Sequence, residues 1–352
     1  MRINKSDRAA SGFRRRLGFH LHRGKGHLLR YAWNRVRWHY YPRFRMAGGF
    51  PDHVDVELSS ICNMRCPMCY TLTGEFKERV PGMTMDFDLF CKIVDDLSAH
   101  RVFSIRLSWR GEPTLNPRFV DCVRYARGKG IKEIASLTNA LQLTPEMFEA
   151  LVDHQMDWLT ISFDGVGEAY EKIRRPAKYE DMVEKIRVFA EIKKRKRSVK
   201  PAVRIQGVWP AIAHNPEEFF AVFEPIADEV SVNTLLDYLH KDREIEYVEN
   251  FVCPVPFQRL VIGSDGRAFM CINDEYGRQP IGDARTQSIG QIWNGEPMRY
   301  VRRIHAERKG RLVFESCNAC YQPRKTTTAV YRIGDRVICL DELVSRPQVV
   351  GQ

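Results

Sequence analysis

The chain has 352 residues, of which 44% are apolar and 28% are charged, as expected for a globular protein with a sizeable core. No run of about 18 apolar residues occurs, which argues against a membrane-spanning helix, and no apolar segment with a cleavage site marks a secretory signal. Ten cysteines therefore indicate a cytoplasmic protein, since grouped cysteines in a reducing compartment bind metals more often than they form disulfides.

The net charge of +11 is concentrated in a basic, aromatic N-terminal arm, residues 1–50. Residues 1–45 hold 13 Lys and Arg against one acid, Asp7, and the rest of the chain is near neutral. Apolar residues recur at helical spacing from Gly26 to Tyr41, which predicts a basic amphipathic helix. Three roles stay open: a cap on the following domain, attachment to an anionic membrane at its periphery, or binding of an acidic partner such as nucleic acid or an acidic peptide.

Strand and helix patterns alternate between His53 and Leu235. Strands are predicted at 54–58, 102–109, 133–138, 158–163, 202–208 and 229–234, and helices at 86–100, 117–128, 145–154, 179–196 and 216–226. Pro145 behind Thr144 and Pro216 behind Asn215 are start signals for two of the helices. Such alternation indicates an α/β domain built on a parallel sheet.

The most specific motif directly follows the first strand. Ile61 to Tyr70 reads I-C-N-M-R-C-P-M-C-Y, which sets Cys62, Cys66 and Cys69 at the spacing C-x3-C-x2-C. Three thiolates can bind three irons of a 4Fe–4S cluster and leave the fourth iron open, as at catalytic metal sites. The alternatives are part of a zinc site or free core thiols.

This loop resembles the cluster loop of the radical S-adenosylmethionine (radical SAM) superfamily. In that family SAM chelates the fourth iron, and the residue before the third cysteine, here Met68, packs near the adenine. The resemblance implies a partial (β/α)6 TIM-like barrel over residues 51–236, since a closed eight-unit barrel needs about 250 residues.

The segment after the second predicted strand reads Arg110-Gly111-Glu112-Pro113. It resembles the family's Gly-Gly-Glu-Pro motif, whose backbone and carboxylate hold the SAM ammonium group through charge-assisted hydrogen bonds. Gly111 and Glu112 are therefore candidate SAM-binding residues, with a surface acid as the alternative for Glu112. Arg110 replaces the first glycine of the motif, which implies a different backbone there.

Two more strand ends resemble SAM-contacting segments of the family. Thr138 and Asn139 match its Thr-Asn-Gly turn, with Ala140 in place of glycine. Ser162 and Asp164 match its Ser-Leu-Asp-Gly segment, which contacts the ribose and carboxylate of SAM, although Asp164 could equally cap the next segment. Four further residues are candidates for substrate contact: Arg204, Gln206, Trp209 and Asn233.

A second cysteine array follows the charged, linker-like residues 237–250. Its members are Cys253, Cys271, Cys317 and Cys320. Two apolar runs around residues 263–266 predict a β-hairpin, and a helix is predicted near 288–309. The spacing alone also suits structural zinc. Beside the first loop, however, the array resembles the SPASM/twitch extension of radical SAM enzymes, and its one-cluster twitch form in particular, which implies an auxiliary 4Fe–4S cluster within residues 237–325.

Three cysteines lie outside both arrays. Cys91 and Cys122 fall in helical patterns and are expected in the core. Cys339 lies in the C-terminal tail, residues 326–352, to which we assign no fold. It is a weak candidate for a hydrogen donor, and a buried or idle thiol is the alternative.

The resemblance implies three cofactors and one partner: SAM, its 4Fe–4S cluster, the auxiliary 4Fe–4S cluster, and an external one-electron reductant of the flavodoxin or ferredoxin type. Reduced SAM breaks into methionine and a 5′-deoxyadenosyl radical, which takes a hydrogen atom from the substrate. Four cysteines leave the auxiliary cluster no open iron, so electron transfer is favoured over substrate ligation. We therefore expect a radical SAM oxidoreductase that catalyses a net oxidation, with epimerisation also open.

The substrate class divides into two hypotheses. A small polar molecule, such as a sugar, cyclitol or nucleoside, fits the single auxiliary cluster and the lack of a recognisable leader-peptide domain. A ribosomally made peptide fits because many relatives with such extensions crosslink, oxidise or epimerise peptides. We favour the small molecule. A hypothesis of another class is a non-catalytic iron–sulfur electron carrier or assembly partner.

Overall fold

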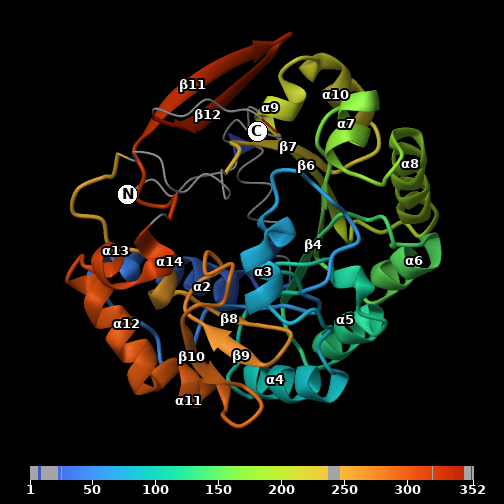
Figure 1. Cartoon of the computed structure of the whole chain (residues 1–352). Coiled ribbons are helices and arrows are strands. Elements are labelled where there is room, and N and C mark those ends of the chain that lie inside the picture. The colour runs from blue at the N-terminus through green and yellow to red at the C-terminus, as the bar shows by residue number, and fades with distance from the viewer. Residues whose placement is uncertain are drawn as a thin grey trace.

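The computed structural model describes residues 7–8, 23–24, 26–236, 246–318, 320–344 and 350 (Figure 1). One sheet runs through the molecule in the order β1-β7-β6-β5-β4-β3-β2-β8-β9-β10. Its six central strands are all parallel. They are β2 (His53–Val56), β3 (Ser104–Arg106), β4 (Glu133–Thr138), β5 (Trp158–Ser162), β6 (Ala202–Val208) and β7 (Glu229–Asn233).

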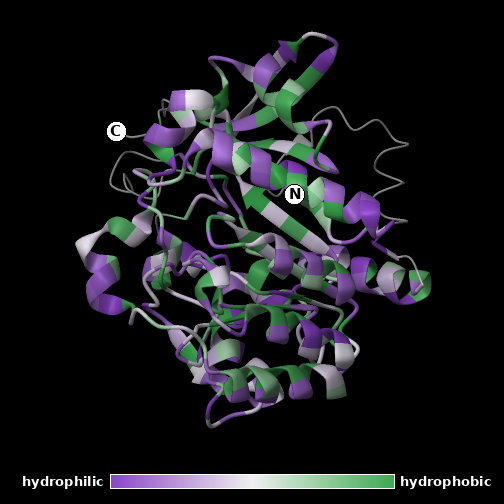
Figure 2. Ribbon diagram, turned by 90° about the vertical axis from the view of Figure 1, so that its right-hand side faces the viewer, coloured by the Kyte–Doolittle hydropathy of each residue, from purple (hydrophilic) through white to green (hydrophobic). Residues whose placement is uncertain are grey.

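Helices cover the outer face of these strands, and each of the five predicted helices forms (Figure 1). Their bounds are α4 (Phe87–Ala99), α5 (Phe119–Gly128), α6 (Pro145–Asp153), α8 (Tyr179–Arg195) and α10 (Pro216–Phe223). Hydrophobic and hydrophilic residues alternate along the helices that face the viewer in Figure 2, as amphipathic helices on a sheet require. The six parallel strands with their helices form the predicted partial TIM-like barrel.

Helix starts follow the sequence signals only in part. The Thr144 side chain accepts a hydrogen bond from the Met147 backbone N–H at 3.2 Å, as an N-cap residue should. Asn215 precedes α10 but its side chain makes no cap, because it donates to Glu218 instead. The barrel also contains three short helices that we did not predict: α3 (Gly74–Arg79), α7 (Gly167–Ile173) and α9 (Trp209–Ile212).

The cysteine-rich extension continues the sheet of the barrel. β8 (Arg259–Ile262) pairs in parallel with β2, and β9 (Arg267–Phe269) returns beside β8 as the predicted hairpin. β10 (Pro280–Asp283) completes this edge. The predicted helix over 288–309 is wrong as one element: α11 (Ile289–Asn294) ends before α12 (Glu296–Ala306), because Pro297 starts a new helix and cannot continue the old one.

A buried ion pair joins the barrel to this extension. The Nε and Nη2 atoms of Arg110 donate to the Glu57 carboxylate at 2.6 and 2.5 Å, and neither side chain is exposed to solvent. Ser264, in the β8–β9 turn, donates its backbone N–H and hydroxyl to the same carboxylate. The arginine that replaces the expected glycine therefore links β2, the loop after β3 and the extension.

The C-terminal tail, to which we had assigned no fold, forms a hairpin of β11 (Thr326–Ile333) and β12 (Arg336–Leu343). It returns to the barrel beside α9 and α10 (Figure 1). The Tyr331 ring lies 4.3 Å from the Trp209 ring, and the Thr234 hydroxyl donates to the Asp341 carbonyl at 2.9 Å. Cys339 faces away from this contact, opposite the exposed Val330.

The predicted arm helix forms as α2 (Leu28–Tyr40) and packs against the amino ends of the barrel strands. The Tyr31 ring lies 5.8 Å from Phe103, just before β3, and Gln258 donates to the Trp38 carbonyl. Of the three roles left open, the cap is therefore present. Two backbone residues, β1 (Asp7–Arg8), pair antiparallel with β7. The remainder of residues 1–22 lies outside the described residues, as do 237–245 of the predicted linker.

The remaining short elements are η1 (Pro42–Phe44), η2 (Tyr70–Leu72), η3 (Pro113–Leu115), η4 (Val255–Phe257), α13 (Gly310–Val313) and α14 (Glu315–Asn318). Every helix in the described part of the chain is too short or too polar to cross a bilayer.

We predict that Arg110→Met lowers the free energy of unfolding by about 3–5 kcal/mol, because it leaves the Glu57 carboxylate buried without its counter-charge. Denaturant unfolding of the full chain measures the change. Arg299→Met is the matched control, since Arg299 pairs with Glu296 on the surface, and we expect little change there. Equal losses in the two variants would contradict a special role for the buried pair.

Candidate functional site

The first three cysteines lie on the loop between β2 and η2, at the carboxyl end of the sheet. The Cys69 backbone N–H donates to the Cys66 carbonyl at 2.9 Å, which closes a turn around the second half of the motif. The Arg65 backbone N–H donates to the Arg175 carbonyl at 2.8 Å and ties the loop to the end of α7. Cys66 is buried, and burial raises its pKa to about 11. Iron binding would offset that cost, because thiolates are the ligands of such clusters.

The Gly111 turn packs directly on the backbone that leads into Cys62. A Cβ atom at Gly111 would lie 2.4 Å from the Ile61 carbonyl oxygen and 2.5 Å from that of Ser59, so only glycine fits. The next backbone N–H, of Glu112, donates to the Ile61 carbonyl at 2.8 Å. The cysteine loop at Cys62 and the Gly111–Glu112 motif, 49 to 50 residues apart in the sequence, thus pack directly against each other.

Glu112 is buried and holds the ends of two neighbouring strands together. Its Oε1 atom accepts hydrogen bonds from the Thr114 hydroxyl at 2.6 Å and the Thr138 hydroxyl at 2.5 Å. Its Oε2 atom accepts from the Asn139 backbone N–H at 2.7 Å. Burial raises the pKa of Glu112, and these donors oppose that rise. Oε2 keeps a second acceptor position, which suits a cationic ligand.

Asn139 reaches from the end of β4 to the cysteine loop. Its Nδ2 atom donates to Asn63 Oδ1 at 2.7 Å and lies 3.8 Å from the Cys62 sulfur. Ala140, which stands where the family has glycine, adopts a left-handed backbone conformation with φ of 58°. The turn therefore keeps the shape that glycine would give, at the steric cost of a Cβ atom.

Ser162 and Asp164 differ in whether their side-chain oxygens are free to bind a ligand. The Ser162 hydroxyl makes no hydrogen bond with the described part of the chain and lies on the inner side of β5. Asp164 is fully buried, and both of its oxygens are engaged: Oδ1 accepts from the Val208 backbone N–H at 2.9 Å, and Oδ2 accepts from Arg174 Nε at 2.7 Å. Both oxygens of the Asp164 carboxylate thus accept hydrogen bonds from protein groups.

Arg174 is a residue that the sequence did not point to. Burial alone would lower its pKa, but the charges of Asp164 and Cys66 outweigh burial and raise it. Its cation therefore lies beside the cysteine loop, held there by Asp164. No motif signals this, because Arg174 follows an unpredicted helix and its partners lie in other segments. Met68 is half-buried and packs against the barrel core, as expected for an apolar wall of this site.

The second cysteine array meets in one cavity. Cys253, Cys271, Cys317 and Cys320 line it together with Asn273 and His305, and it contains about 300 Å³ of space free of protein atoms, part of which is open to solvent. The four thiols approach from the segment before η4, the segment after β9, α14 and the segment after α14. Burial raises the pKa of all four, to about 11 for Cys320.

Hydrogen-bond donors surround these sulfurs. The Asn273 backbone N–H lies 3.3 Å from Cys271 Sγ and its side-chain Nδ2 lies 3.5 Å from Cys320 Sγ, which also accepts from the Gln322 N–H at 3.4 Å. His305 Nε2 lies 3.8 Å from Cys317 Sγ, and burial lowers the pKa of His305 to about 4. Donors to cluster sulfurs are typical of iron–sulfur sites, where they tune the potential.

The donor sets of both sites fit iron–sulfur clusters. Soft thiolates are the ligands that such clusters use, and the second site offers four of them with matching N–H donors. In the ranges that the structure describes, no three His, Cys, Asp or Glu side chains converge tightly enough to bind one metal ion.

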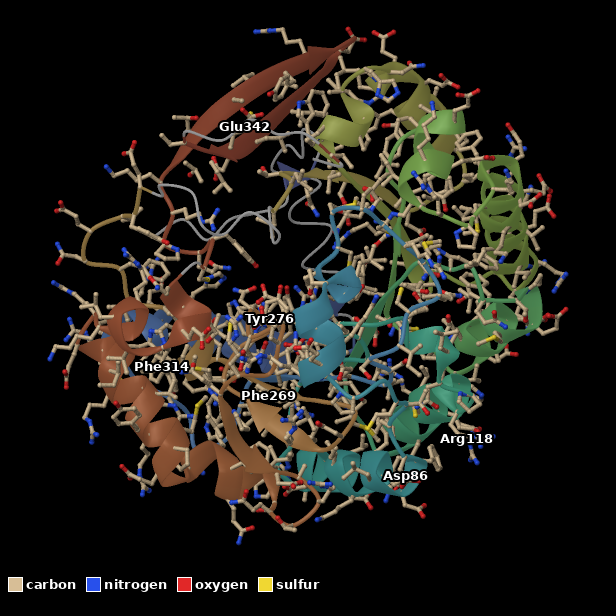
Figure 3. All side chains as sticks on the ribbon, viewed as in Figure 1. Asp86, Arg118, Phe269, Tyr276, Phe314 and Glu342 are labelled. Atoms are coloured by element: carbon tan, nitrogen blue, oxygen red, sulfur yellow. The ribbon has the colours of Figure 1, made fainter. Side chains whose placement is uncertain are left out.

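Aromatic side chains connect the two cysteine groups. Tyr70, next to Cys69, has its ring centroid 6.3 Å from that of Tyr276. Trp109 Nε1 donates to the carbonyl of Ile272, next to Cys271, at 2.7 Å. The Trp109 ring also lies 5.2 Å from Phe269, and Figure 3 shows Phe269 and Tyr276 near each other at the centre of the molecule. The Tyr70–Tyr276 ring contact and the hydrogen bond from Trp109, two residues before Gly111, thus link the segments around the two sites.

Comparison with known proteins defines the class to which this fold and these sites belong. The family model for the radical SAM superfamily matches residues 56–200, and the model for the SPASM iron–sulfur cluster-binding domain matches residues 253–321. Together they cover more than half of the chain. The protein therefore belongs to the radical SAM superfamily and carries a C-terminal SPASM domain. SAM, a SAM-binding 4Fe–4S cluster and auxiliary cluster ligation are the cofactor set of such proteins.

A curated relative from Pyrococcus furiosus, the tungsten-containing aldehyde ferredoxin oxidoreductase cofactor-modifying protein, is 34% identical over 143 residues. The match covers 36% of this chain and 39% of that protein, so the chain matches about two fifths of the relative's length. Activity and substrate of the whole relative do not transfer from such a match.

Two solved structures share the fold. BtrN in complex with AdoMet and 2-DOIA aligns with a TM-score of 0.55 at 18% identity, over 78% of this chain and 94% of BtrN. SuiB from Streptococcus suis, bound to its precursor peptide SuiA, aligns with a TM-score of 0.54 at 13% identity, over 84% of this chain and 76% of SuiB. At these identities the likeness concerns the fold.

We predict that Gly111→Ala lowers reductive SAM cleavage by about a hundredfold, because a displacement of about 1 Å near reacting groups has that effect. The added methyl group would push the loop of Cys62 away from Glu112. Anaerobic assays of 5′-deoxyadenosine formation, with iron content measured in parallel, test this. Gly128→Ala is the control, since a Cβ there meets no atom within 4 Å. Unchanged cleavage in Gly111→Ala would refute the close packing.

Proposed function

We propose that this chain is a radical SAM oxidoreductase that acts on a small polar molecule of the sugar, cyclitol or nucleoside type. Cys62, Cys66 and Cys69 would hold the SAM-binding cluster, and the array beginning at Cys253 would hold the auxiliary cluster. When bound, the first cluster and SAM supply reductive cleavage of SAM to methionine and a 5′-deoxyadenosyl radical, which takes a hydrogen atom from a C–H bond. An external flavodoxin or ferredoxin would supply the electron.

The protein's part in this reaction is to bind and orient SAM. Glu112 Oε2 and the Gly111 backbone would receive the SAM ammonium group, Ser162 would bind a polar group of SAM, and Met68 would pack near the adenine. Thr138 would act through Glu112, because its hydroxyl already donates to that carboxylate. Asp164 would likewise act through Arg174, since both of its oxygens have protein partners. Asn139 would hold Cys62 in position.

The substrate class rests on polar residues along the inner face of three strands. Thr160, Arg204 and Glu229 lie side by side in register on β5, β6 and β7. Ser162, Gln206 and Ser231 form the next row towards the carboxyl ends of the strands. Residues that alternate with them, such as Ile161 and Ile205, are buried on the helix side. The inner surface near SAM is therefore polar.

Two polar groups on this inner surface have no hydrogen-bond partner among the described residues. Ser231 Oγ and Asn233 Oδ1 are shielded from solvent and make no hydrogen bond with the described residues. Buried polar groups without partners cost free energy, and a substrate hydroxyl or amide would relieve that cost. This observation supports a substrate with hydrogen-bonding groups, and the single auxiliary cysteine array is what favours a small molecule over a peptide. Of the other three candidates, Gln206 lies in the second row of the inner face, Arg204 pairs with Glu229 at 3.0 Å, and the Trp209 ring packs against the Tyr331 ring.

The auxiliary site favours a net oxidation. Cys253, Cys271, Cys317 and Cys320 would ligate every iron of the auxiliary cluster, which would leave no iron open to the substrate and would supply electron-acceptor chemistry there. The hydrogen bond from Trp109 to the loop of Cys271 gives that route a direct connection to the SAM side. Epimerisation, in which no electron leaves, stays the second reaction type.

A ribosomally made peptide is the second candidate substrate. The solved complex of SuiB with SuiA supports it only through the shared fold. The non-catalytic hypothesis, an electron carrier or assembly partner, would require that reduced protein leave SAM intact.

We predict about eight irons per reconstituted chain, as two 4Fe–4S clusters require, and about four in Cys317→Ala/Cys320→Ala. Replacing Cys62, Cys66 and Cys69 with alanine should also halve the iron and abolish SAM cleavage. The double variant at the second site should retain SAM cleavage. Iron near four with one zinc in the unmodified protein would refute the auxiliary cluster, and SAM left intact would favour the carrier.

We predict that deuterium from a small-molecule extract enters 5′-deoxyadenosine. The extract is prepared from cells grown in heavy water, filtered to remove macromolecules and split into portions with and without peptidase digestion. A small non-peptide substrate gives deuterated 5′-deoxyadenosine in both portions, whereas loss of the label after digestion would indicate a peptide. Gln206→Leu should lower deuterium transfer while SAM cleavage continues.

A further inference from the structure

Helix α2 presents a continuous apolar stripe to solvent on the side opposite the barrel. Leu29, Trp33, Val36 and Tyr40 are spaced by four, three and four residues, so they share one face of the helix. Leu29 is 90% exposed and Trp33 is 58% exposed, which is unusual for large apolar side chains. Phe44, in the turn that follows the helix, is also 68% exposed.

The helix is fixed with this face outward. On its other side, Tyr31 and Asn34 are buried, and Arg37 forms an ion pair with Asp52 at 3.2 Å. The Arg30 side chain donates to the Arg101 carbonyl, and the rings of Tyr31 and Phe103 are in contact. Rotation of α2 to bury the stripe would break all of these contacts. These contacts therefore hold the stripe on the outer side of α2.

Exposed arginines lie close to the stripe, and the described segment 26–51 contains no Asp or Glu. Arg43 and Arg45 follow the helix, and Arg101 lies beside its first turn. All three are exposed, and none forms an ion pair within the described residues. The arm of residues 1–45 carries 13 basic residues and one acid in the sequence. An apolar stripe flanked by unpaired cations fits a partner that offers both hydrocarbon and negative charge.

We propose that this face of α2 docks on an anionic phospholipid bilayer. The side chains of Leu29, Trp33 and Val36 would enter the region between headgroups and acyl chains, while Arg43 and Arg45 contact lipid phosphates. Trp and Tyr are the aromatic residues favoured at that depth. A nucleic acid or an acidic peptide would use the arginines but gain little from Leu29 and Val36, so the apolar stripe favours lipid.

This attachment would leave the reaction end of the barrel free. α2 covers the amino ends of β2 and β3, whereas Cys62 and Glu112 lie beyond the carboxyl ends of these strands. The docking face and the SAM site are thus at opposite ends of the strands, and variants on one should spare the other. The proposal stands independently of the substrate argued above.

Co-sedimentation of the reconstituted full chain with vesicles tests the proposal. We expect binding to phosphatidylcholine vesicles that contain phosphatidylglycerol, and weak binding to phosphatidylcholine alone. Leu29→Ser/Trp33→Ser should lower the partition coefficient at least about tenfold, because each large apolar side chain contributes about that much when buried. Leu312→Ser on α13 is the matched control, since Leu312 is 82% exposed but lies outside the stripe.

A charge variant gives a second, independent test. Arg43→Gln/Arg45→Gln should also weaken binding at least about tenfold, since each basic residue near an anionic surface contributes about a factor of five. SAM cleavage, measured in every variant, reports whether the fold is intact, and it should stay unchanged.

Three results would overturn the proposal. The first is equal binding to neutral and anionic vesicles, or equal losses in Leu312→Ser and Leu29→Ser/Trp33→Ser. The second is a lipid-free dimer in analytical ultracentrifugation that Leu29→Ser/Trp33→Ser converts to a monomer, which would assign the stripe to a second copy of the chain. The third is binding to homopolymeric RNA that the apolar variant retains, without binding to vesicles, which would assign the arm to a polyanion.

Discussion

The structure depends on one buried ion pair, between Glu57 and Arg110. Both side chains are removed from water, so hydrogen bonds must offset the cost of burying the two charges. Arg110 Nη1 is the part of the pair without a hydrogen-bond partner among the described residues. Here the Glu57 carboxylate accepts from Arg110 and from both donors of Ser264. The guanidinium also stacks on the Trp109 ring, 3.9 Å from its centroid. A charge that would be costly alone is thus held by groups from three segments.

The position of this pair explains its importance. Glu57 stands at the end of β2, five residues before Cys62, and Arg110 stands directly before Gly111. Ser264 belongs to the hairpin that leads to Cys271. Glu57 is therefore close in sequence to the first cysteine loop, and Arg110 is adjacent to the Gly111–Glu112 motif. These hydrogen bonds therefore hold the first cysteine loop, the Gly111 turn and the hairpin before Cys271 in a fixed relative position.

The barrel and the two cysteine groups could be predicted from the sequence, because their signals are local. Alternating apolar periods give strands and helices, and the spacing of Cys62, Cys66 and Cys69 is specific. The β11–β12 hairpin also carried a local signal that we did not use, since Gly334 and Asp335 separate two alternating runs. Pro297 likewise marked the break between α11 and α12.

The roles of individual polar residues could not be predicted from local sequence signals. Arg110 departs from the family pattern, and its role becomes clear only from its ion pair with Glu57, which lies on another segment. Asp164 matches a SAM-contacting position, yet its oxygens go to Arg174 and to the backbone of Val208, which lie on different elements. Whether a side chain is free to bind a ligand depends on its hydrogen-bond partners in the fold. These partners are distant in the sequence, and a single sequence does not show which residues come together.

The parallel pairing of β2 with β8 has a consequence for biogenesis. Glu57 and Ser264 are 207 residues apart, so the thiols of Cys62, Cys66 and Cys69 leave the ribosome long before β8 exists. Until then β2 has an open edge and the Glu57 carboxylate lacks part of its hydrogen bonds. Non-local pairing of this kind is slow and exposes strand edges during synthesis. The hydrogen bonds that fix Glu57 near the first cysteine loop are therefore complete only after the extension has been translated.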